Sequence, residues 1–132
     1  MRVVEVEGGA TQCGVLAAAS SAETKATMTR FLEAVRQNKM EKRLLEMLAA
    51  YRAGDGSALA RLTDDDFGKS TEGGAAKRRI FDDRHAFMAD KIDAYFKQPE
   101  NHFVVIGVGH MFGDNNLLDA LAKKGIRAKR VE

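Results

Sequence analysis

The chain has 132 residues, of which 45% are hydrophobic and 30% are charged, a composition typical of one soluble globular domain over residues 1–132. Its 21 basic and 19 acidic residues leave a net charge of +2, too small and too interspersed for a nucleic-acid-binding surface. No stretch approaches the roughly 20 apolar residues that a membrane span requires. The lone Cys13 cannot form an internal disulfide, so we expect a fold that does not depend on an oxidising compartment.

The first predicted element is a β-strand over residues 2–7, where apolar and other residues alternate as Arg-Val-Val-Glu-Val-Glu. A period of two places Glu5 and Glu7 on one face of this strand and Val4 and Val6 on the other. The two carboxylates interrupt the apolar stretch, so this N-terminus is not a secretory signal peptide.

Helical spacing of apolar residues dominates the next part of the chain. A short helix is expected over about 12–19, a second helix from Ser20 or Ser21 to about residue 35, and a third over 39–51. A short helical turn follows over 58–62. The three aspartates at 64–66 predict an N-terminal capping cluster rather than a cation site.

Residues 68–74 are rich in Gly, Ser and Thr and predict a flexible loop, and one long helix is expected over 75–96. Arg84 lies four residues before Met88, which belongs to the apolar stripe of this helix. An arginine near a buried face needs a polar partner, because unpaired burial is costly. Glu5 and Glu7 are the candidates. A salt bridge that only holds the helix in place and a catalytic role for Arg84 both remain open.

The run Phe103-Val-Val-Ile-Gly-Val-Gly-His110 predicts a strand buried on both faces and ended by its glycines. His110 then lies just past the carboxyl end of a core strand. Ligands and catalytic groups collect at that edge of open α/β sheets, although a structural histidine is the alternative.

A helix containing Leu117, Leu118 and Leu121 follows, capped by Asp114 or Asn115 and ended at Gly125, before a last strand. The fold class expected is therefore α/β and helix-rich, with a small mixed sheet of about three strands and several surrounding helices. Three strands are few for a closed layer. This favours a fragment of a longer protein or a partner that completes the sheet.

Three segments carry a resemblance to a known family. Residues 83–113 run from Asp-Arg-His through a Met-Ala helix to a strand ending in Gly-Val-Gly-His and then Met-Phe-Gly. Upstream, Glu5-Val-Glu7 precedes Gln12, and residues 51–55 read Tyr-Arg-Ala-Gly-Asp. This order resembles the C-terminal half of the TraB/GumN family, to which the TIKI metalloproteases are related. The motif glycines are Gly107, Gly109 and Gly113.

The resemblance implies a metal-dependent, peptidase-like hydrolase that uses a divalent metal, manganese or cobalt, and acts on peptides or proteins. It implies His110 as a metal ligand with Glu7 as a second one. It also implies Glu7 and Arg84 as catalytic groups, with Arg84 stabilising a developing oxyanion. Longer relatives are often exported or membrane-associated.

Two departures from the family pattern matter. The family carries two Gly-x-x-His motifs and this chain has only the second, so we expect the first to lie upstream of residue 1 or to be supplied by a second copy in a homodimer. His85 stands where the family has Asn, and we expect His85 and His102 to be surface or capping histidines. A non-catalytic binding or scaffold domain is the alternative function.

Overall fold

The computed structural model describes residues 2–131, and within that range the chain is all-α. In chain order the helical elements are α1 Gly9–Ala17, α2 Ser21–Arg36, α3 Met40–Ala53, α4 Gly56–Phe67, α5 Thr71–Lys77, a π-helical turn Arg78–Asp82, α6 Asp83–Phe96, a 3₁₀ turn Val108–His110 and α7 Leu117–Ala122. No helix in the described range is both long and apolar enough to cross a membrane.

The predicted α/β class with a sheet of about three strands is wrong, since residues 2–131 contain no β-strand. The segments expected as strands are non-helical, but residues 2–7 and 101–106 make no backbone–backbone hydrogen bond within the described range. A strand exists only through ladder hydrogen bonds to a neighbour. Side-chain alternation alone therefore could not decide between a paired strand and an isolated extended segment.

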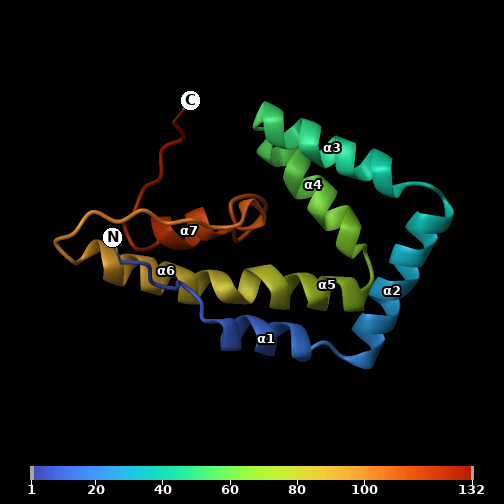
Figure 1. Cartoon of the computed structure of the whole chain (residues 1–132), viewed down its shortest axis with the longest axis horizontal. Helices are drawn as coiled ribbons and strands as arrows, with labels where there is room; N and C mark the ends of the chain where they lie inside the picture. The colour runs from blue at the N-terminus through green and yellow to red at the C-terminus, as the bar shows by residue number, and fades with distance from the viewer. Residues whose placement is uncertain (1, 132) are drawn as a thin grey trace.

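One face of segment 103–106 is nevertheless buried, whereas the apolar face expected on residues 2–7 is not, since Val4 is 43% exposed. Exposure alternates along 103–106, with Phe103 93% and Val105 78% exposed and Val104 and Ile106 half-buried, so burial on both faces is also wrong. The half-buried side chains pack on the core formed by α6 and α7; they are Val6, Val104, Ile106 and Ile126. In Figure 1 the blue N-terminal segment and the orange segment after α6 both run past the α6–α7 pair.

The helix α5, the π-helical turn and α6 follow one another as a single long rod through the molecule (Figure 1). The helix α1 lies on one side of this rod and α7 on another. The long helix expected over 75–96 is therefore present. It begins earlier, because the Ser70 side chain accepts a hydrogen bond from the backbone N–H of Gly73 and caps α5. The predicted flexible loop over 68–74 is correspondingly wrong from Thr71 onward.

The remaining helices form an open frame around one end of this rod (Figure 1). A tight turn at Gly54, with φ of 62°, joins α3 to α4, and these helices share a second small core of Ala50, Leu59 and Leu62. The aspartates at 64–66 lie in the last turns of α4, so they do not cap its start. Instead Asp66 accepts a hydrogen bond from Arg43 of α3 at 2.8 Å.

Candidate functional site

The π-helical turn comes immediately before the residues of the candidate site. It spans Arg78–Asp82, and Asp83 begins α6. A π turn takes more residues than an α turn and thereby rotates the helix that follows it, so it changes the direction in which Arg84 and His85 project. Such turns occur frequently at functional sites. The rod is therefore irregular immediately before Arg84 and His85.

Arg84 and Glu7 form a bidentate pair. Arg84 Nε donates to Glu7 Oε1 at 2.8 Å, Nη2 donates to Oε2, and Nη1 donates to the Ile80 carbonyl at 2.8 Å. The Glu7 side chain is only 4% exposed. The hydrogen bond from Arg84 holds the pKa of Glu7 below its ordinary value, although burial opposes that shift. Of the two glutamates considered as partners, the structure brings Glu7 to Arg84.

His85 and His110 form a hydrogen-bonded chain that ends on a backbone carbonyl. His85 Nδ1 lies 2.6 Å from the carbonyl oxygen of Asn115, and His85 Nε2 lies 3.0 Å from His110 Nδ1. A carbonyl oxygen only accepts, so His85 Nδ1 must donate, and in a neutral ring Nε2 then accepts. His110 Nδ1 is consequently the donor of the second bond. The Nε2 atom of a neutral His110 is left with its lone pair free.

The surroundings of His110 favour its neutral form. Burial is the largest cause lowering the pKa of His110, and the positive charge of Arg84 adds to it, although the negative charge of Glu7 opposes the shift. The ring of Phe81 lies 5.1 Å from that of His110, centroid to centroid. No residue in the range 2–131 hydrogen-bonds His110 Nε2. This atom therefore has the chemistry of a base or of a metal ligand.

Glu7, Arg84 and His110 all line one groove of about 560 Å³, which lies between the N-terminal segment 2–7 and the segment 101–107. We call this the segment groove. Its walls are partly apolar, including Val104 and Ile106, and partly polar, because Arg2, Glu5, Gln12, Asn101 and His102 also line the groove. The three residues chosen from the sequence as ligand and catalytic groups thus meet in space.

The motif glycines have different roles. Gly113 adopts φ of 84°, a left-handed conformation that favours glycine. A Cβ on Gly109 would lie 2.8 Å from the Phe81 ring, so this position requires the absence of a side chain. At Gly107 the nearest neighbour of an added Cβ would be the His110 ring at 3.8 Å, an ordinary contact.

His85 is the site residue that the sequence did not identify. It was expected at the surface or at a helix cap, yet it is 4% exposed and holds His110. Its burial depends on the loop after the 3₁₀ turn, where Asn115 adopts φ of 55° and offers its carbonyl. The one available sign was that His85 replaces the Asn of the family pattern. His102 stacks on Tyr95 with ring centroids 5.9 Å apart, away from this chain of hydrogen bonds.

The described residues do not make a complete metal centre. No group of three or more His, Cys, Asp or Glu residues within 2–131 is arranged to hold an ion, whereas catalytic zinc sites usually have three protein ligands. Both Glu7 oxygens accept hydrogen bonds from Arg84. This favours a role for Glu7 as the ion-pair partner of Arg84 over a role as a metal ligand. His110 Nε2 does fit a ligand, because its other ring nitrogen is fixed by a second residue, as is usual for metal-bound histidines.

Comparison with known proteins identifies the family to which the chain belongs. A family model described as the TraB/PrgY/gumN family matches residues 1–130. Because the match covers nearly the whole chain, it does not bear out the restriction of the resemblance to a C-terminal half. No curated protein and no solved structure matches the chain. By the extent of the family match and the motifs it includes, this chain belongs to the TraB/PrgY/gumN family.

Proposed function

We propose that this chain is a metal-dependent, peptidase-like hydrolase domain whose site a second copy of the chain completes. The observation that supports the proposal best is the free Nε2 of His110, which the hydrogen-bonded chain through His85 to Asn115 holds in one orientation. A divalent cation, manganese or cobalt by family resemblance, would supply Lewis acidity when bound. His110 is the ligand that the described residues offer.

The second copy is needed because one uncommitted donor cannot hold a catalytic ion. A two-fold dimer places the same residue of each subunit around its axis, so two His110 side chains can contribute two of the three protein ligands that a catalytic ion usually has. The Arg84–Glu7 pair then has a positioning role beside them. Arg84 also keeps N–H groups beyond those bound to Glu7 and Ile80, and these can donate to an oxyanion in the segment groove.

Peptides are the proposed substrates because of the segment groove. The backbone of 2–7 and 101–106 has no backbone partner within the described range, and these two segments line both sides of the groove. An extended peptide offers its own N–H and C=O groups to such segments in the manner of an added strand. The groove leads such a peptide past Arg84 and His110.

Native mass spectrometry after incubation with Mn²⁺ tests the proposal, because it reads subunit number and bound metal together. We expect a dimer that holds metal and loses it in the variant His110→Ala. The matched control is His102→Ala, which removes another histidine of the same groove and should keep the metal. A monomer without metal, or metal retained in His110→Ala, would contradict the proposal.

A non-catalytic binding domain is the second candidate, and the complete engagement of the Glu7 oxygens by Arg84 favours it. In that case the pair only fixes the segment 2–7 against α6. A hydrolase should lose turnover of a fluorogenic peptide library in Arg84→Lys while peptide affinity changes little, since Lys keeps the charge but not the planar geometry. A binding domain has no turnover to lose and responds only in affinity.

A further inference from the structure

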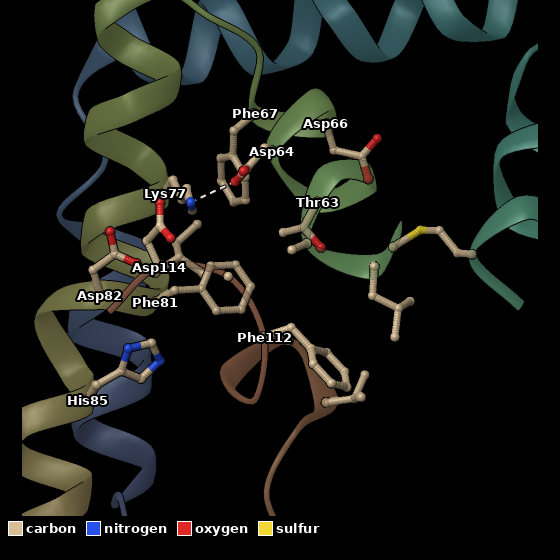
Figure 2. A pocket seen from close by; sticks show the side chains of 17 residues that line it. Thr63, Asp64, Asp66, Phe67, Lys77, Phe81, Asp82, His85, Phe112 and Asp114 are labelled. Carbon is tan, nitrogen blue, oxygen red and sulfur yellow. Dashed lines mark ion pairs between the residues drawn. The ribbon is translucent and has the colours of Figure 1, made fainter. Parts of the chain in front are cut away.

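A second cavity, of about 410 Å³, lies on the other side of the histidine pair, between α4, the middle of the rod and the loop 108–114. We call it the Phe cavity, because Phe67, Phe81 and Phe112 line it (Figure 2). The Phe67 and Phe81 rings meet edge to face, with centroids 5.9 Å apart and planes at 87°. Figure 2 shows the rings of Phe81 and Phe112 projecting into the same space, with His85 at the border.

Two glycines keep these rings in place. A Cβ on Gly56 would lie 2.5 Å from Cδ1 of Phe112, and a Cβ on Gly109 would lie 2.8 Å from Cε1 of Phe81. Both distances are too short for a side chain, so each phenyl ring occupies the space that a larger residue would take. The aromatic walls therefore depend on small residues from α4 and from the 3₁₀ turn.

The charged groups around the Phe cavity are predominantly acidic. Four aspartates line it against a single lysine: Asp64, Asp66, Asp82 and Asp114, with Lys77. Lys77 is bound to Asp64 at 2.6 Å, and Arg43 is bound to Asp66 at 2.8 Å. Asp82 and Asp114 form no ion pair with any residue in the range 2–131.

The charges of the Asp82 and Asp114 carboxylates both affect the same residue of the cavity wall, Lys77. Asp82 and Asp114 each raise the pKa of Lys77 by their charge, after the larger effect of its hydrogen bond to Asp64. Figure 2 places Lys77, Asp82 and Asp114 on one side of the cavity and the phenyl rings beside them. The cavity thus presents negative potential next to an apolar space with aromatic walls.

We propose that the Phe cavity binds an organic ammonium ion, with an aromatic or aliphatic body between the phenyl rings and its ammonium group at Asp82 and Asp114. Phenyl faces attract cations, and the apolar walls bury the body of such a ligand. Anions are disfavoured by the carboxylates. A bare divalent cation would need a cage of oxygen ligands, and no three or more His, Cys, Asp or Glu residues within 2–131 are arranged as one.

The proposal is independent of the proposed hydrolase activity. His85 lines the Phe cavity and His110 lines the segment groove, so the two spaces meet at the histidine pair without sharing the reactive Nε2. Binding of an ammonium ion requires neither a metal nor a second copy of the chain. Failure of one proposal therefore leaves the other intact.

The test uses 2-phenylethylamine as probe, with phenylacetate and 2-phenylethanol as probes of the same shape but negative or zero charge. We expect the amine to cause saturable shifts in the NMR signals of Phe67, Phe81 and Phe112, with a Kd of about 1 mM or tighter, as small fragments reach. Phenylacetate should cause none, and the alcohol should bind about tenfold more weakly. Equal binding of all three probes, or no saturation by about 10 mM amine, would overturn the proposal.

Matched variants locate the ammonium group. Asp82→Asn and Asp114→Asn should each weaken amine binding about tenfold, because a hydrogen bond to a charged group is stronger than a neutral one. Glu100→Gln removes the same charge at an exposed position outside the cavity and should leave affinity unchanged. Lys77→Met releases Asp64 and should tighten binding about tenfold, a gain that misfolding cannot produce. Weaker or unchanged binding in Lys77→Met would count against the proposal.

Discussion

His85 Nε2 lies 3.0 Å from His110 Nδ1, and this contact fixes which nitrogen of His110 carries a proton. Because the Asn115 carbonyl requires a proton on His85 Nδ1, the order of donors runs from His110 through His85 to the backbone. The arrangement has the same logic as a catalytic histidine that a buried partner holds in one tautomer. In this chain the anchor is a neutral carbonyl.

The tautomer of His110 is directly measurable. In metal-free buffer with EDTA, long-range ¹H–¹⁵N NMR spectra should show a neutral His110 protonated at Nδ1, with a titration midpoint below 6.5 because burial lowers its pKa. The variant His85→Phe keeps a ring of similar size but removes the acceptor, so it should yield a mixture of both tautomers. His102→Ala should leave the His110 signals unchanged. Protonation at Nε2 in the unmodified chain would contradict the assignment.

Breaking the Arg84–Glu7 pair should destabilise the fold strongly. Removing either partner leaves the other charged group buried without a counter-ion, which costs about 3–5 kcal/mol in comparable cases. We expect this loss in the free energy of unfolding of Glu7→Gln and of Arg84→Met, measured by urea denaturation. The double variant should lose less than the sum of the two, because no unpaired buried charge remains.

An exposed ion pair supplies the control for that comparison. Lys97 binds Asp93 at 2.7 Å, but the lysine side chain is 72% exposed, so Lys97→Gln should cost less than about 1 kcal/mol. Single variants of Glu7 and Arg84 that are no more destabilising than Lys97→Gln would show that solvent reaches the Arg84–Glu7 pair.

Acid should weaken the fold through Glu7. The pKa of this carboxyl is lowered from 4.5 in the folded chain, chiefly by the hydrogen bond from Arg84, so the unfolded chain takes up the proton first as pH falls. The contribution to stability is therefore complete above pH 4.5 and is lost as pH falls through the lower folded pKa. Urea titrations across this window should show a smaller slope of stability against pH in Glu7→Gln. An unchanged slope would mean that other carboxyls dominate acid unfolding.

Local sequence signals predicted α2, α3 and α6 well, whereas α4 was expected only as a short turn over 58–62 and most of α5 as a flexible loop. Ser20 caps α2 by accepting from the backbone of Glu23, whose side chain accepts in return from Ser20, and this capping box is readable from residue types alone. The π-helical turn was not readable, since its residues fit an ordinary α-helix. The sheet failed for a different reason: apolar residues such as Val104 and Ile106 indicate that a segment packs on the core, but they cannot supply a hydrogen-bonding neighbour.

The candidate site, too, was predicted only in part from the sequence. An arginine near a buried stripe needs a counter-charge, so the choice of Glu5 or Glu7 for Arg84 followed from elementary electrostatics. His85 could not be placed from sequence, because its partner is a backbone carbonyl that a positive φ at Asn115 presents. Backbone conformations of this kind are set by the whole loop.

The backbone of the segment 103–106 gives a last prediction. Its amides have no backbone partner among residues 2–131, so they should exchange with deuterium rapidly, whereas amides of α6 should be protected by their helical hydrogen bonds. If a second copy or a peptide binds in the segment groove as an added strand, exchange at Val105 should slow by at least about tenfold, while α3 stays unchanged as the internal control.

Hydrogen exchange measured by mass spectrometry over a range of protein concentrations separates the two occupants. Protection that grows with chain concentration identifies the second copy, and protection that appears only with added peptide identifies a substrate. Slow exchange in the dilute chain alone would contradict an unpaired segment.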